Sequence, residues 1–83
     1  MIRFALYSRS YCHLCDDMLH ALQRLSSEFA FTVDVIDVDA DQALVDKYDE
    51  LVPVLTVRRA DAETEVCHYF LDEGRVRALF TRG

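Results

Sequence analysis

The sequence predicts an α/β fold in which a four-stranded mixed sheet carries helices on both faces. Apolar runs with strand character alternate with stretches of helical periodicity, in the order β-α-β-α-β-β-α. Strand, helix and strand within the first half favour a parallel pair with a right-handed crossover, whereas the last two strands are close enough for a hairpin. With 83 residues, 52% of them hydrophobic, the chain suits a single domain over residues 1–83.

The first half of the chain predicts two strands around one long helix. Residues 2–7 are mostly apolar and suit a central strand. The helix is predicted from apolar side chains at every third or fourth position, which are Leu14, Met18, Leu22, Leu25 and Phe29. Residues 31–38 alternate apolar and polar side chains until Ile36, where the phase shifts. That shift indicates either a bulge or a fully buried strand end.

A short helix is predicted after the second strand. Asp39 can cap its first turn, and Gln42 stands three residues on, where its side chain can reach back. The helix must end near Leu51 because Val52 precedes Pro53, and a residue before proline is pushed toward an extended conformation.

The last third of the chain predicts a hairpin and a final helix. Residues 53–58 and 64–71 have strand character, and the polar residues 59–63 between them suit a short connection. Asp72 is expected to cap the helix that follows.

Two cysteines lie at the connection between the first predicted strand and the first predicted helix. Cys12 falls at the helix N-terminus, where unpaired backbone N–H groups and the helix dipole stabilise a thiolate. Cys15 lies about one turn on, on the buried face. A C-x-x-C pair near a β-α-β pattern indicates a thiol–disulfide site. We therefore expect Cys12 to attack a disulfide and Cys15 to resolve the mixed disulfide that forms.

Charged neighbours should tune the Cys12 thiol. Arg9, and His13 when protonated, favour the thiolate, whereas Asp16 and Asp17 oppose it. With the helix N-terminus added, we expect the pKa of Cys12 to lie below the ~8.5 of a free thiol, without an extreme depression.

Two other interpretations of the cysteines stay open. Cys12, Cys15, Cys67 and a histidine, His13 or His68, are ligands that zinc accepts, although the chain has no second C-x-x-C and no closely spaced histidine pair. The fold could also serve as a binding module without catalysis. We assign no metal ligand, and expect Cys67 to be a small buried hydrophobe.

Composition limits the classes of binding partner and the cellular compartment that we expect for this protein. A net charge of −6 argues against nucleic acid, whose phosphates need a basic surface. No apolar run is long enough for a membrane span or a signal peptide, so we expect a cytoplasmic protein. Three cysteines, an odd number, argue against a structural disulfide framework. We expect a monomer.

Residues 7–15, Tyr-Ser-Arg-Ser-Tyr-Cys-His-Leu-Cys, are followed later in the chain by Val52–Pro53. With the element order, these features resemble the glutaredoxin-like branch of the thioredoxin-fold superfamily. The resemblance implies a thioredoxin-like fold and a thiol–disulfide oxidoreductase acting on protein or mixed disulfides. It also implies a cis Val52–Pro53 bond that faces the cysteine loop, with the backbone of Val52 offered to the substrate.

The chain departs from the glutaredoxin pattern at two places. His13-Leu14 replaces the Pro-Tyr usual between the two cysteines, and Tyr69-Phe70 stands where a Gly-Gly pair usually lets glutathione approach. Bulky side chains there would close the glutathione site, so we expect weak or absent glutathione binding and no tightly bound cofactor.

The resemblance also assigns substrate contacts. Arg9 stands where a basic residue often meets a glutathione carboxylate, and Asp72 stands near where an acidic residue often meets the glutathione amino group. Tyr11 and His13, on either side of Cys12, are expected to shape the surface that the substrate meets.

Overall fold

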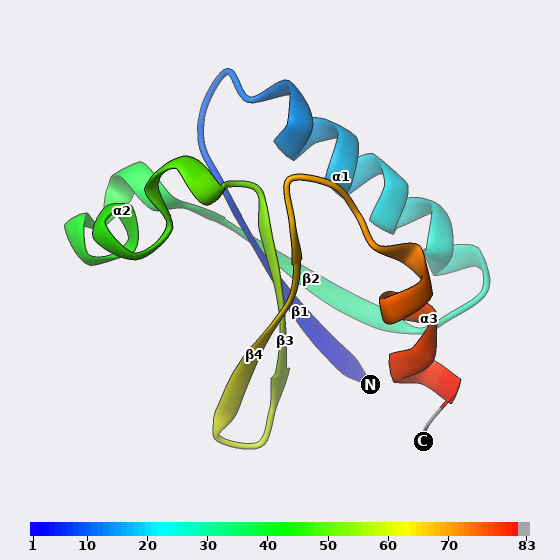
Figure 1. The fold of residues 1–83 in the computed structure, drawn as a ribbon. Helices are drawn as coiled ribbons and strands as arrows, with labels where there is room; N and C mark the ends of the chain where they lie inside the picture. The colour runs from blue at the N-terminus through cyan, green and yellow to red at the C-terminus, as the bar shows by residue number, and fades with distance from the viewer. Residues whose placement is uncertain (82–83) are drawn as a thin grey trace.

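The computed structural model describes residues 1–81, and in it a four-stranded sheet is flanked by three α-helices (Figure 1). The elements are β1 (Ile2–Ser8), α1 (His13–Arg24), β2 (Phe31–Asp37), α2 (Gln42–Tyr48), β3 (Val54–Arg59), β4 (Ala62–His68) and α3 (Glu73–Thr81). Short 3₁₀ turns follow α1, β2 and α2, over η1 (Leu25–Ser27), η2 (Val38–Ala40) and η3 (Asp49–Leu51). The predicted element order is confirmed.

The sheet has the strand order β2-β1-β3-β4. β1 runs parallel to β2 and antiparallel to β3, and β3 and β4 form an antiparallel hairpin. The predicted parallel pair and hairpin are therefore both present. Ser8 pairs with Asp37, so the carboxyl ends of β1 and β2 meet at one end of the sheet. The cysteine loop leaves β1 at that end.

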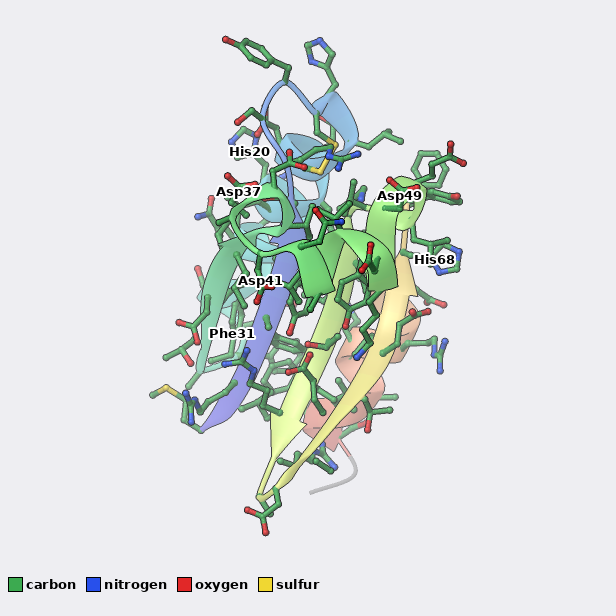
Figure 2. All side chains as sticks on the ribbon, turned by 90° about the vertical axis from the view of Figure 1, so that its left-hand side faces the viewer. His20, Phe31, Asp37, Asp41, Asp49 and His68 are labelled. Atoms are coloured by element: carbon green, nitrogen blue, oxygen red, sulfur yellow. A yellow bond between two sulfur atoms is a disulfide. The ribbon has the colours of Figure 1, made fainter. Side chains whose placement is uncertain are left out.

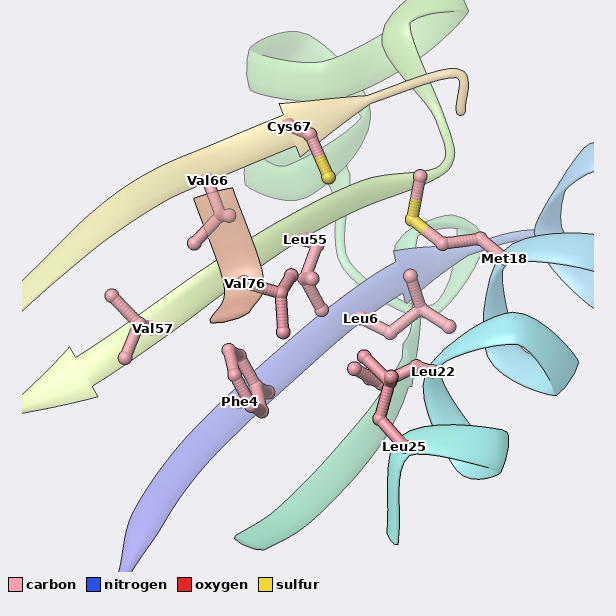
Figure 3. Close-up of a cluster of buried hydrophobic side chains, with 10 residues drawn as sticks. All are labelled: Phe4, Leu6, Met18, Leu22, Leu25, Leu55, Val57, Val66, Cys67 and Val76. Atoms are coloured by element: carbon pink, nitrogen blue, oxygen red, sulfur yellow. The ribbon is translucent and has the colours of Figure 1, made fainter. Parts of the chain in front are cut away.

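Two apolar clusters hold the layers together, since α1 and α3 cover one face of the sheet and α2 covers the other (Figure 1). The first cluster, under α1 and α3, contains Phe4, Leu6, Met18, Leu22, Leu25, Leu55, Val57, Val66, Cys67 and Val76 (Figure 3). The second cluster, under α2, contains Ala5, Tyr7, Cys15, Val38, Tyr48, Val52 and Val54. One of the two predicted redox cysteines is thus a core residue.

The phase shift in β2 comes from burial on the second face of the sheet. The register of β2 against β1 is continuous, so no bulge is present. Ile36 packs against the second cluster, while Val35 is 53% exposed and Val38 is buried. α2 covers the second face of the sheet only near the carboxyl end of β2. The apolar side chains of β2 therefore change to that face near the end of the strand.

The prediction that Asp39 caps α2 is wrong. Asp41 caps the helix, and its carboxylate accepts a hydrogen bond from the Ala43 N–H at 2.9 Å. Asp39 instead lies in η2, and its own N–H donates to Asp37 at 3.0 Å. Gln42 donates to Asp46 rather than reaching back to a cap. Three aspartates at alternate positions offer the same chemistry, and the extra 3₁₀ turn decides which of them caps.

The hairpin and the last helix differ from the prediction only at their bounds. Ala60, with φ 52°, and Asp61 form the turn, which is shorter than predicted. β4 ends at His68 and not at residue 71, because Tyr69 takes a left-handed φ of 63°. Asp72 caps α3 as predicted, and its carboxylate accepts from the Arg75 N–H at 3.1 Å.

The apolar side chains along α1 differ in burial, and a pair of substitutions can test this difference. Leu22 is fully buried in the first cluster, whereas Leu14 is 37% exposed. Leu22→Ala should lower the free energy of unfolding by about 2–5 kcal/mol, because it leaves a cavity. Leu14→Ala should cost less than about 1 kcal/mol. Urea unfolding of both variants checks this, and equal losses would contradict the burial difference.

Candidate redox site

Cys12 and Cys15 form a disulfide at the N-terminus of α1, with their Cα atoms 5.2 Å apart. Cys12 is the N-cap residue, in an extended conformation at φ −108° and ψ 104°. Its Sγ accepts a hydrogen bond from the Cys15 N–H at 3.1 Å. The sulfur thus lies where the free N–H groups of the helix point, an environment that stabilises a thiolate after reduction.

The two sulfurs differ in their access to solvent. Cys15 is 3% exposed and belongs to the second cluster, beside Tyr7 and Val52. Cys12 is half-buried at the edge of the same cluster. A dissolved partner can therefore approach Cys12, whereas the apolar cluster shields Cys15.

The segment before β3 lies against the disulfide. The Val52–Pro53 peptide bond is cis, and both residues are buried. Val52 packs in the same cluster as Cys15. The Pro53 carbonyl accepts a hydrogen bond from the Tyr69 N–H at 2.9 Å, which ties the β4–α3 loop to this segment. The cysteine loop, the segment before β3 and the β4–α3 loop thus meet at one end of the sheet (Figure 1).

Large apolar side chains are exposed in these three loops and in the first turn of α1. We call them the apolar rim: Tyr11, Leu14, Leu51, Tyr69 and Phe70. Tyr11 is fully exposed and Phe70 is 69% exposed. Scattered single apolar residues are ordinary on a protein surface, but a gathering of them at one end is typical of an interaction surface.

The same loops hold most of the left-handed backbone. In residues 1–81, four non-glycine residues have positive φ, and Tyr11, Asp49 and Tyr69 are three of them. Such conformations are unfavourable for residues with a side chain, and they gather at functional sites more often than elsewhere.

The structure gives Arg9 and Asp72 structural partners. The Arg9 guanidinium pairs with Asp39 at 2.8 Å, and this hydrogen bond raises the pKa of Arg9. The nearby carboxylate offsets the charge that was expected to act on Cys12. Asp72 is occupied as the cap of α3. His13 is the exposed first residue of α1.

A polar network on the second face was missed by the sequence reasoning. The Tyr7 hydroxyl donates to Glu63, and Arg58 Nε donates to the same carboxylate at 3.0 Å. Burial, followed by the hydrogen bond to Glu63, raises the pKa of Tyr7. Burial alone would raise the pKa of Glu63, but hydrogen bonds from Tyr7 and Arg58 outweigh it and lower that pKa. A tyrosine at an inward strand position, which needs a partner for its hydroxyl, was the available signal.

Cys67 stands apart from the disulfide. It is 8% exposed in the first cluster, and burial raises the pKa of its thiol, so the predicted role as a buried hydrophobe is confirmed. His68 contacts Glu65 at 3.1 Å. Within residues 1–81, no three His, Cys, Asp or Glu side chains lie close enough to hold a metal ion together. The zinc interpretation therefore gains no support from the geometry.

Comparison with known proteins points to one family. A family model described as Glutaredoxin-like domain (DUF836) matches residues 3–81. No protein of curated function matches the chain. In the part of the chain that the structure describes, no helix has the length and apolar character needed to cross a membrane.

Solved structures agree with the family. Protein Ne2328 from Nitrosomonas europaea is 35% identical, with a TM-score of 0.83 over 94% of this chain and 89% of that one. Protein XcR50 from X. campestris is 33% identical, with a TM-score of 0.63 over 96% and 97%. A mutant thioredoxin from Halobacterium salinarum is 25% identical, with a TM-score of 0.72 over 98% and 73%. The fold is therefore thioredoxin-like.

The difference in burial predicts the order in which the reduced thiols react. Cys12 should be alkylated first because it is half-buried at a helix N-terminus. Cys15 should react more slowly, and Cys67, with its raised pKa, only after unfolding. A timed iodoacetamide pulse at pH 7, read by peptide mass spectrometry, gives the order. First modification at Cys15 or Cys67 would contradict the assignment.

Proposed function

Because this chain belongs to the glutaredoxin-like domain family, we propose that it is a thiol–disulfide oxidoreductase that reduces protein disulfides. The observation that carries the proposal is the unequal burial of the Cys12–Cys15 disulfide at the N-terminus of α1. A reachable first sulfur and a shielded second sulfur are what a two-step exchange needs.

The reaction proceeds by two thiolate attacks. The Cys12 thiolate attacks one sulfur of the substrate disulfide, forms a mixed disulfide and releases the first substrate thiolate. Cys15, deprotonated in turn, attacks the Cys12 sulfur, closes the Cys12–Cys15 bond and releases the second substrate thiolate. The substrate gains two electrons and its thiolates take up two protons. A dithiol reductase or a small thiol then returns the protein to the reduced state.

The position of Cys15 favours this order of events. Its backbone N–H donates to Cys12 Sγ at 3.1 Å, so a Cys12 thiolate is stabilised before the substrate arrives. Its own sulfur is shielded by the second cluster, so a bulky substrate reaches Cys12 first. Once the mixed disulfide has formed, Cys15 is already beside the sulfur it must attack.

Replacing each cysteine separately tests the assignment of roles. Cys12→Ser should abolish disulfide reduction, because no nucleophile reaches the substrate. Cys15→Ser should instead trap a mixed disulfide with the substrate, visible as a covalent adduct by mass spectrometry. Full activity of Cys12→Ser with loss in Cys15→Ser would reverse the roles. If neither substitution mattered and zinc copurified with the protein, the metal interpretation would replace this one.

Protein disulfides suit the site better than glutathione does. Tyr69 and Phe70 are bulky, exposed residues of the β4–α3 loop, which the hydrogen bond from the Tyr69 N–H holds against Pro53. Arg9, the cation expected to meet a glutathione carboxylate, is paired with Asp39. Anionic glutathione would therefore gain little attraction at an end of the molecule that is rich in carboxylates.

Opening the β4–α3 loop tests the preference against glutathione. Wild-type protein should turn over glutathione with a small mixed disulfide weakly or not at all, and Tyr69→Gly/Phe70→Gly should raise this rate. Tyr69 has φ 63°, so glycine there keeps the backbone that the loop already has. The assay couples glutathione oxidation to a reductase that consumes NADPH.

Tyr11→Gly is the matched control for that substitution. It also removes an exposed tyrosine from a left-handed position, at φ 59°, but leaves the β4–α3 loop closed. This control should gain no glutathione turnover. Robust turnover by the wild-type protein would show that the loop blocks nothing. A protein that reduces neither glutathione mixed disulfides nor protein disulfides would be a binding module.

A further inference from the structure

Four carboxylates next to the redox site have no partner. Asp16 and Asp17 lie in α1 beside Cys15, and Asp49 and Glu50 precede the Leu51–Pro53 segment. Within residues 1–81, none of the four side chains makes a hydrogen bond or an ion pair. The other nearby aspartates are engaged as caps or in an ion pair, namely Asp37, Asp39, Asp41 and Asp72.

Helix electrostatics favours the first of these two pairs and acts in both directions on the second. Asp16 and Asp17 lie near the N-terminus of α1, where the helix dipole favours negative charge. Asp49 and Glu50 directly follow the last residue of α2, where the dipole favours cations, but they also form the first turn of η3, where it favours anions. Lys47, in the last turn, is the residue there that complements the dipole. The two helical ends therefore act in opposite directions on Asp49 and Glu50, and neither gives these carboxylates a partner.

Charge is unevenly distributed over the molecule. The three segments at the end that carries the disulfide, residues 9–17, 37–50 and 69–73, contain ten carboxylates and two Lys or Arg residues. The remainder of the chain contains five carboxylates and seven Lys or Arg residues. Figure 2 shows Asp37 and Asp49 toward the end with the disulfide, while Phe31 lies toward the other end. The redox end is thus strongly negative although the rest is slightly positive.

The apolar rim and the unpartnered carboxylates together have the composition of a docking surface for another protein. The five exposed side chains of the rim come from the cysteine loop, the first turn of α1, η3 and the β4–α3 loop, and the four unpartnered carboxylates lie in α1 and η3, next to them in sequence. An apolar centre with a charged border is the usual anatomy of a protein–protein interface. A border of one sign selects a partner of the opposite sign, and steers its approach.

We infer that the substrate is a protein whose disulfide lies in a positively charged loop with apolar residues beside the cysteines. This inference rests on the proposed function and adds the class of substrate. The apolar residues of the partner would pack on the rim around Cys12, and its Lys or Arg side chains would lie opposite Asp49 and Glu50 on one side and Asp16 and Asp17 on the other. Exchange then proceeds by the two thiolate attacks described above.

A single-turnover assay with two matched peptides tests the inference. Both are disulfide-closed peptides of one sequence, with leucine beside each cysteine and either lysine or glutamate at the four flanking positions. The reduced protein, freed of reductant, is mixed with each peptide, quenched with acid and analysed for new peptide thiols. The lysine peptide should react about tenfold faster or more at low salt. At about 1 M salt the ratio should fall to about threefold or less.

Two double variants locate the source of the preference. Asp49→Asn/Glu50→Gln should lower the low-salt ratio to about threefold, because it removes charge at the docking surface. Asparagine also tolerates the positive φ of 25° at Asp49. Asp61→Asn/Glu28→Gln makes the same chemical changes at the far end of the molecule, and should keep the wild-type ratio.

The outcomes separate the inference from the proposed function. Equal rates for the two peptides, at low and high salt, would overturn the inference and leave the reductase standing. A preference that survives Asp49→Asn/Glu50→Gln would overturn the assignment to these carboxylates. If neither peptide is reduced, although a control dithiol reduces both, the proposed function fails and the inference fails with it.

Discussion

The central strand β1 is the constraint on which the rest of the structure depends. It pairs with β2 on one edge and with β3 on the other, and the run from Phe4 to Tyr7 is buried on both faces. Every helix packs on the sheet that this strand centres, through one apolar cluster or the other. Because residues 4–7 pair with both neighbouring strands and are covered on both faces, the cysteine loop begins from a well-packed strand end.

The packing on which the cysteine loop rests explains why the two cysteines differ in burial. Cys15 is part of the second cluster, so the apolar packing that stabilises the sheet also shields its sulfur. Cys12, three residues earlier, is the cap of α1 at the edge of that packing. A single helical turn thus carries one sulfur from the core to the surface. The helix start and the apolar packing together produce the difference between the two sulfurs, since the Cys15 N–H donates to Cys12 Sγ and the second cluster covers Cys15.

Unfavourable backbone conformations and exposed apolar side chains gather at the end of the molecule that carries the disulfide. Tyr11, Asp49 and Tyr69 have positive φ there, which is unfavourable for residues with a side chain. Exposed apolar side chains stand in the same loops. On the second face of the sheet, by contrast, polar groups are paired, as in the network of Tyr7, Arg58 and Glu63. A fold held by its sheet can tolerate such loops, and exposed loops on a rigid scaffold are where proteins commonly carry binding residues.

The amino-acid sequence by itself determined the order of the elements, the parallel pair and the hairpin, and the place of Cys12 and Cys15, because periodicity and motif spacing are local properties of the chain. It could not choose between Asp39 and Asp41 as the cap of α2, since neighbouring aspartates have the same chemistry. Nor could it separate Leu14 from Leu22, which share one helical stripe but differ in what packs over them. The pairing of Arg9 with Asp39, and the lack of a partner for Asp49 and Glu50, depend on segments distant in sequence. Only the tertiary structure decided these, because burial and charge pairing are properties of what lies nearby in space.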